Sequence, residues 1–217
     1  MKENEIRSYF DSIAEDFDSY YESPRGVADR MINEWLRRPG LVKRLQIALD
    51  FSDPVQGKRI LDVGCGSGKF VVECAKKGAK VVGVDVSEEM VRLAENACRM
   101  NGVTAEFIVG DIHDLQLNGF DVCVCLGVVE YFQDPEPLIR KIFHAVVPGG
   151  RIVMSVPSLL APQTPLRAAF LFRRGVHCYF FTKRQMKEIC LAHGTEPRSV
   201  KFASYGPGFV FMGEKQA

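Results

Sequence analysis

From Lys58 onward the sequence alternates between short apolar runs and longer amphipathic stretches. The apolar runs are typical of buried strands, and the amphipathic stretches between them are typical of helices. The predicted strands are residues 59–63, 80–84, 105–109, 120–125 and 151–156, and the predicted helices are residues 68–77, 88–101 and 135–146. Alternation of this kind predicts a parallel sheet with helices on both faces.

The end of the chain has a different pattern. Thr182 is a good N-cap for one more helix, which is expected to end near His193. Two strand-like runs, 198–205 and 209–213, flank Gly206-Pro207-Gly208, and this arrangement predicts an antiparallel hairpin. The sequence therefore predicts an α/β fold with a seven-stranded, mostly parallel sheet that ends in this hairpin.

The first fifty residues precede the alternating pattern and are expected to be helical. Their apolar side chains recur at steps of three and four, at Ile6, Tyr9, Phe10, Ile13, Phe17 and Tyr20. A second helical stretch is expected after Pro24, with a break at Pro39-Gly40 and a continuation to Leu49. This N-terminal segment either packs on the core or forms a helical lid over a ligand.

No internal repeat or Gly/Ser linker divides the 217 residues, so we expect a single domain. Residues 1–50 form the predicted helical cap and residues 51–156 the strand–helix core. Residues 157–181 contain several prolines and aromatic residues and are expected to be an insertion beside the core. Residues 182–217 supply the last helix and the hairpin.

Composition narrows the classes of function. The chain has 28 Lys+Arg and 27 Asp+Glu residues, so its net charge of +1 provides no field to attract nucleic acid, and we expect no nucleic-acid partner. The longest apolar run, Val122–Val129, is far shorter than the roughly 20 residues of a membrane span. The charged start does not resemble a signal peptide. We therefore expect a cytoplasmic protein without membrane insertion, either a monomer or a homodimer.

The seven cysteines lie mostly in apolar segments, which favours buried thiols in a reducing compartment over a disulfide framework. Cys123 and Cys125 would share one face of a strand. No second His/Cys pair at zinc-finger spacing accompanies them, so no metal site is expected.

The most informative residues are Leu61–Gly68, where a predicted strand runs into glycines at positions 64, 66 and 68. Glycines allow the tight turn between strand and helix and let a ligand approach the backbone. The dinucleotide fingerprint requires a third glycine at position 69, where the chain has Lys69, and no stretch matches the phosphate-binding P-loop.

Three carboxylates are expected near this turn. Asp62 directly precedes it, Asp85 ends the second strand, and Asp111 follows the third. The carboxyl ends of parallel strands meet at one edge of the sheet, where ligands bind. Three acids would repel a pyrophosphate but can accept hydrogen bonds from an ammonium, ribose hydroxyls and an exocyclic amine. S-adenosylmethionine has all three groups.

These motifs resemble those of class I S-adenosylmethionine-dependent methyltransferases. The resemblance rests on Asp62-x-Gly64-x-Gly66-x-Gly68, Asp85 and Gly110-Asp111, with residues 120–126 and Val147-Pro148-Gly149-Gly150 as further matches, and it spans residues 55–156. It implies a Rossmann-like sheet, S-adenosylmethionine as cofactor and S-adenosylhomocysteine as product.

The resemblance also implies roles for individual residues. Asp62 would lie near the ammonium, Asp85 would hold the ribose hydroxyls and Asp111 would reach the adenine amine. For Met90 and His113, packing in the core or a position in a solvated turn is equally consistent with the sequence. The full set of predicted cofactor contacts is Asp62, Gly64, Cys65, Gly66, Gly68, Asp85, Val86, Met90, Asp111, Ile112, His113, Leu126 and Tyr20.

The sequence motifs that would indicate the methyl acceptor are weaker than those for the cofactor. The N-terminal Tyr-Phe-Asp pattern and the 157–181 insertion resemble methyltransferases of quinone, tetrapyrrole and natural-product biosynthesis. Small-molecule members, such as those of quinone biosynthesis, often have Glu-His after the fourth strand. Here Glu130 matches, while Tyr131 replaces the histidine. Glu130 and His177 are the candidate catalytic residues, since either can act as a base, although each can equally be structural. Tyr131, Tyr179 and Tyr9 are the candidate substrate contacts.

The aromatic and aliphatic residues at 159–181 indicate an apolar acceptor pocket or, alternatively, a packed subdomain. We therefore expect a methyltransferase that acts on a small, largely apolar molecule, foremost at oxygen. Methylation of nitrogen or carbon is the alternative. Methylation of RNA or protein is less favoured, because the Pro-Pro motif common in such enzymes and a basic extension are both missing.

Overall fold

The computed structural model describes residues 7–8, 11, 38–165, 168–169 and 177–217, and these residues form one α/β unit around a seven-stranded sheet. The strand order is β3-β2-β1-β4-β5-β7-β6. The strands are β1 (Arg59–Val63), β2 (Lys80–Asp85), β3 (Glu106–Val109), β4 (Phe120–Leu126), β5 (Val146–Pro157), β6 (Lys201–Ser204) and β7 (Gly208–Glu214). The predicted seven-stranded α/β fold is confirmed.

Strands β1 to β5 are parallel to one another, whereas β7 pairs antiparallel with both β5 and β6. The predicted terminal hairpin is therefore confirmed. Strand β5 begins five residues earlier than expected, at Val146, because its pairing with β4 shifts register between Phe120 and Val122 and absorbs the Pro148-Gly149-Gly150 turn. The chain order reverses between β1 and β4, which is where ligands bind in open α/β sheets.

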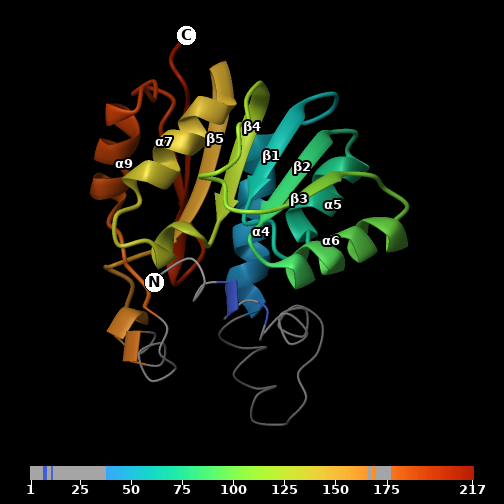
Figure 1. The fold of residues 1–217 in the computed structure, drawn as a ribbon. Helices are drawn as coiled ribbons and strands as arrows, with labels where there is room; N and C mark the ends of the chain where they lie inside the picture. Colours follow the sequence, from blue (N-terminus) through green and yellow to red (C-terminus); the bar gives the residue numbers. More distant parts are fainter. Residues whose placement is uncertain (1–6, 9–10, 12–37, 166–167, 170–176) are drawn as a thin grey trace.

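Helices cover both faces of this sheet (Figure 1). Helices α7 (Glu136–Ala145) and α9 (Lys183–Ala192) pack on one face, with Met154 and Phe211 in their core. Helices α4 (Arg38–Ser52), α5 (Lys69–Lys76) and α6 (Glu88–Met100) contribute to the core on the other face. The parallel strands therefore have apolar side chains on both faces.

Helix α4 differs from the sequence prediction. Pro39 and Gly40, where a break was expected, are helical within Arg38–Ser52, and residues 12–37 before them lie outside the described residues. Proline is tolerated in a first turn because its missing N–H has no partner there in any helix. One uninterrupted helix thus lies along the sheet face, with Ala48 fully buried.

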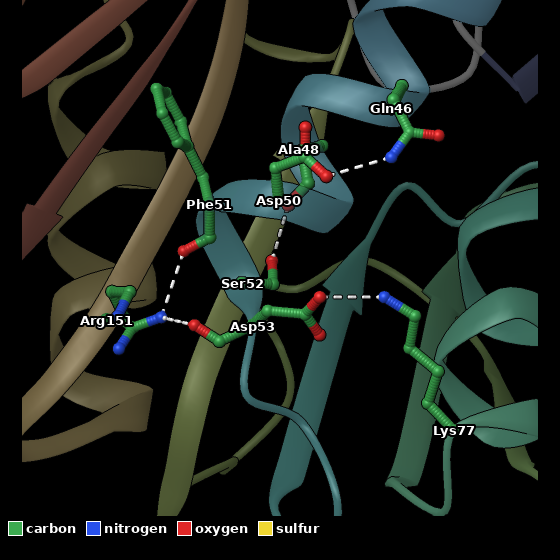
Figure 2. A network of polar contacts seen from close by, with 8 residues as sticks. All are labelled: Gln46, Ala48, Asp50, Phe51, Ser52, Asp53, Lys77 and Arg151. Carbon is green, nitrogen blue, oxygen red and sulfur yellow. Dashed lines mark hydrogen bonds and ion pairs between the residues drawn. The ribbon is translucent and has the colours of Figure 1, made fainter.

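Polar contacts fix the C-terminal end of α4 (Figure 2). The Arg151 guanidinium on β5 donates to the carbonyl oxygens of Phe51 and Asp53, and the Asp53 carboxylate pairs with Lys77 Nζ at 2.8 Å. The Ser52 hydroxyl donates to the Ala48 carbonyl at 2.7 Å. The bond to Phe51 satisfies a carbonyl group that a helix end leaves unpaired, and the contacts of Arg151 and Lys77 connect the end of α4 to both β5 and the end of α5.

The seven cysteines all belong to the described part of the chain, and each is buried except the half-buried Cys178. Burial raises the pKa of the Cys123 and Cys65 thiols well above the ordinary value. The expectation of buried thiols is therefore confirmed for six of the seven. None of the helices within the described ranges combines the length and the apolar character needed to cross a membrane.

Candidate functional site

The glycine turn connects β1 to α5 and bends over the end of β2. The backbone N–H groups of Gly64 and Cys65 both donate to the Val84 carbonyl, at 2.8 and 3.0 Å. Gly64 has φ of +72°, and a Cβ there would overlap the Val128 side chain from the loop after β4. Position 64 therefore requires glycine for its conformation and for its neighbour.

Asp62 lies one residue from the C-terminal end of β1 and is buried, with 2% of its surface exposed. Burial is the main cause that raises its pKa, from an ordinary value of 3.8 to about 7. The nearby Asp85 charge raises the pKa further, whereas the Arg44 charge lowers it. A cation placed beside Asp62 would therefore stabilise its ionised form.

Asp85 ends β2 and is held by main-chain donors. The Gly66 N–H donates to one carboxylate oxygen at 2.9 Å, and the Ser87 N–H donates to the other at 3.0 Å. Burial raises the pKa of Asp85, and these two hydrogen bonds oppose the shift. The carboxylate is thus fixed between the glycine turn and the start of α6, which Ser87 caps.

The start of α6 also contacts the N-terminal part of the chain. The Ser87 hydroxyl donates to the Asp11 carboxylate at 2.5 Å, across 76 positions of sequence, and accepts from the Met90 N–H at 3.1 Å. Asp11 is close enough to raise the pKa of Asp85. A residue of the predicted N-terminal cap therefore lies at the same edge of the sheet as Asp85. That the cap acts as a lid stays a prediction.

Asp111 lies in the loop after β3. The Gly110 N–H donates to the Asp85 carbonyl at 2.9 Å, so this loop is joined to the end of β2. The Asp111 carboxylate accepts from the His113 N–H at 2.8 Å, and the His113 ring packs edge-on against Phe132, with 6.1 Å between ring centres. The structure thus brings Asp62, Asp85 and Asp111 to one edge, as expected.

Glu130 lies on the short helix η2 (Val129–Tyr131) after β4 and is 3% exposed. Its carbonyl accepts from the Tyr179 N–H at 2.7 Å, so residues 177–181 lie against the loop that carries Glu130. Tyr179 is half-buried, whereas His177 is exposed. The structure therefore brings two of the predicted acceptor-side positions together across 49 positions of sequence.

A family model described as a methyltransferase domain matches residues 54–188. This stretch is more than half of the chain and contains all five parallel strands. The chain belongs to this methyltransferase family. The family and enzyme class expected from the sequence are confirmed, and so is the cofactor of that family, S-adenosylmethionine.

The similarity of this methyltransferase to individual relatives is lower, at 19–30% sequence identity. It is 28% identical over 178 residues to a ubiquinone biosynthesis O-methyltransferase of Bordetella avium, covering 76% of this chain and 73% of that protein. It is 30% identical over 165 residues to the protein of the same name from Ralstonia nicotianae, covering 71% and 69%. Its fold is similar to that of magnesium protoporphyrin IX methyltransferase from Synechocystis PCC 6803 with bound SAH, with a TM-score of 0.78 and 19% identity over 99% of this chain and 100% of that one.

The remaining predicted contacts of the methyltransferase vary in exposure. Cys65, Met90 and Ile112 are buried, with Met90 at 1% exposed, so its side chain packs inside the protein. Val86, Leu126 and Tyr131 are half-buried. Tyr9 and Tyr20 lie outside the described residues. Within the described ranges, no group of three or more His, Cys, Asp or Glu side chains could hold a metal ion.

Sequence reasoning missed Arg44. A Cβ built on Gly127 would lie 2.6 Å from Arg44 Nη1 and 3.7 Å from Glu130 Oε1, so the guanidinium and the carboxylate face the same small space. Arg44 also acts on the Asp62 charge. It precedes the buried Ala48 by one helical turn, and a basic residue on the buried side of a helix is a signal that could have identified it.

Proposed function

We propose that this methyltransferase transfers the methyl group of S-adenosylmethionine to an oxygen atom of a small, largely apolar molecule. The observation that carries the proposal is the charge pattern at the carboxyl edge of the sheet. Asp62, Asp85 and Asp111 lie at or just after the ends of adjacent strands, and the Arg44 guanidinium lies beside Gly127 with Glu130 and acts on the charge of Asp62.

These residues fit the groups of the cofactor. Asp62 would hold the ammonium and Arg44 the carboxylate of the methionine part, because a buried acid and a nearby guanidinium complement a zwitterion. Asp85 would accept from the ribose hydroxyls and Asp111 from the adenine amine. S-adenosylmethionine supplies an already activated methyl group, so the protein mainly needs to align the acceptor.

Glu130 is the proposed base for an acceptor hydroxyl. Its side chain is buried, its carboxylate faces the space beside Gly127 and Arg44, and its main-chain carbonyl accepts from the Tyr179 N–H. General bases contribute roughly 10²–10⁴-fold to rate. His177 is exposed and is therefore the weaker candidate.

The names of the relatives support oxygen as the methylated atom. The Bordetella and Ralstonia proteins are ubiquinone biosynthesis O-methyltransferases. The Synechocystis protein is named for magnesium protoporphyrin IX, another ring compound. Phe132, two residues after Glu130, and Tyr179, whose N–H bonds to the Glu130 carbonyl, pack against the same apolar core as Phe181, which favours an acceptor that is largely apolar.

The test is methyl transfer with a donor whose methyl group carries deuterium. We would incubate the purified protein with this donor and a panel of phenols, amines and ring-activated carbon acids, and locate the label by mass spectrometry. Labelled methyl ethers support the proposal. Label on nitrogen or carbon alone would assign the alternative chemistry, and label on tRNA or protein with none on small molecules would reject a small-molecule acceptor.

A further inference from the structure

Ser155 on β5 has a buried side chain whose hydroxyl forms no hydrogen bond with any part of the described chain. The residue is 0% exposed. A buried polar group without a partner costs free energy, so such groups are uncommon in folded proteins. Ser155 lies near the carboxyl edge of the sheet, where ligands bind in this type of fold. An unpaired hydroxyl at this edge indicates that its hydrogen-bond acceptor is a group of the bound ligand.

The register of the sheet gives the direction of this side chain. On β5, Met154 and Val156 belong to the core under α7 and α9, whereas Val153 belongs to the core under α4. Side chains alternate along a strand, so Ser155 faces α4 with Val153. Its partner on β4 is Leu126, which packs on the same side.

Two charged residues lie in the same layer. Asp62 pairs with Val124 on β4, two residues before Leu126, and shares its face with Ile60 in the core under α4. Arg44 on α4 lies against Gly127, the residue that follows Leu126. Ser155, Asp62 and Arg44 therefore surround the end of β4 from β5, β1 and α4.

We propose that Ser155 donates a hydrogen bond to the methionine carboxylate of the bound cofactor, beside Arg44. The inference rests on the proposed function and adds Ser155 to the residues that would contact the cofactor. Arg44 and Ser155 are donors and suit a carboxylate, whereas Asp62 is an acceptor and suits the ammonium. A hydroxyl and a guanidinium together would distinguish the amino-acid end of the cofactor from a nucleoside that lacks it.

The experiment compares two ligands. S-adenosylhomocysteine has the carboxylate, and 5′-methylthioadenosine shares the nucleoside but lacks the amino-acid group. We expect Ser155→Ala to weaken binding of S-adenosylhomocysteine about tenfold and to leave 5′-methylthioadenosine unchanged, because a hydrogen bond to a charged group is removed. Both affinities are measured by calorimetry on the full chain.

Thr195→Val is the matched control. Thr195 also has a buried hydroxyl without a partner in the described chain, but it pairs with Lys215 beyond the end of β7, near the opposite end of β5. This variant should bind both ligands as the parent does. Ser155→Cys, which keeps the shape but donates weakly, is a second variant if Ser155→Ala fails to fold.

The outcomes separate the two proposals. If the parent protein binds neither ligand, the proposed function fails and the role of Ser155 fails with it. If the parent binds S-adenosylhomocysteine and the Ser155 variants bind it equally well, only the role of Ser155 is rejected. An equal loss for both ligands also rejects it, because the hydroxyl would then act on the site as a whole.

Discussion

Asp62 and Asp85 lie at the ends of neighbouring strands, and different surroundings control the pKa of each carboxyl group. Two main-chain N–H groups hold the carboxylate of Asp85, whereas burial and the charges of Asp85 and Arg44 set the pKa of Asp62. The carboxylate of Asp85 is therefore already oriented to accept hydrogen bonds from a ligand. Asp62 requires a nearby cation to stabilise its ionised form. The two acids are expected to respond differently to pH and to substitution.

The stability of the unliganded protein should depend on pH through Asp62. Its pKa is about 7 in the folded state and 3.8 ordinarily, so between these values the folded protein holds a proton that the unfolded chain has released. This contribution is fully present below pH 4 and is lost as pH rises through 7. Asp62→Asn should remove this part of the slope and be more stable than the parent above pH 7, by roughly 1–3 kcal/mol. Urea unfolding from pH 5 to 8 measures the difference, and parallel curves for the two proteins would contradict it.

Asp85→Ala should weaken binding of S-adenosylhomocysteine about 10- to 100-fold, because charge-assisted hydrogen bonds to the ribose are lost. Calorimetric titration measures this effect. Glu88→Gln, which changes an exposed acid three residues along the chain, is the control and should bind as the parent does. Unchanged binding by a folded Asp85→Ala variant would mean that the ribose lies elsewhere.

Gly64→Ala should destabilise the protein more than Gly57→Ala. Both glycines have φ near +73°, at +72° and +73°, but a Cβ at position 57 meets nothing within 4 Å, whereas one at position 64 overlaps Val128. Gly57→Ala therefore measures the backbone cost alone, about 1 kcal/mol, and Gly64→Ala adds a steric cost of about 1–3 kcal/mol. Denaturant unfolding of both variants gives the two values, and equal losses would show that Val128 moves aside freely.

Glu130→Gln should lower kcat by roughly 10²–10⁴-fold once an acceptor is known, because the amide cannot take a proton. Binding of S-adenosylhomocysteine should change little. The pH–rate profile of the variant should lose the limb that reports ionisation of the base. A profile that keeps this limb would instead indicate another base, and His177→Gln is the variant to examine next.

The sequence predicted the glycine turn and the three acids at one edge of the sheet because these signals are local. Each acid lies at or just after the end of its own strand, and the turn geometry follows from glycine itself. Arg44 and Ser155, which the two proposals add, have no such signal at a strand end. Arg44 depends on how α4 lies on the sheet, and Ser155 depends on its register with Leu126 across two strands.

The acceptor half was harder to predict for a related reason. Glu130 was a candidate from its place after the fourth strand, but its proximity to Tyr179 depends on the return of a segment 49 residues later. Nothing in the composition of residues 177–181 specifies that return. The helical conformation of Pro39 and Gly40 in α4 was not predicted, because the rule that proline ends helices does not apply in a first turn.

The bond between Tyr179 and Glu130 joins two main-chain atoms, as does the bond from the Leu159 N–H to the Phe181 carbonyl. These two main-chain bonds therefore do not depend on which side chains residues 177–180 carry, proline at position 179 excepted, whereas the buried Phe181 side chain is part of the core. Under the proposed function, substitution of these side chains would change the range of acceptors while both main-chain bonds remain. The glycine turn does not have this freedom, because a Cβ at position 64 overlaps Val128, so we expect acceptor preference to change more readily than the methyl donor.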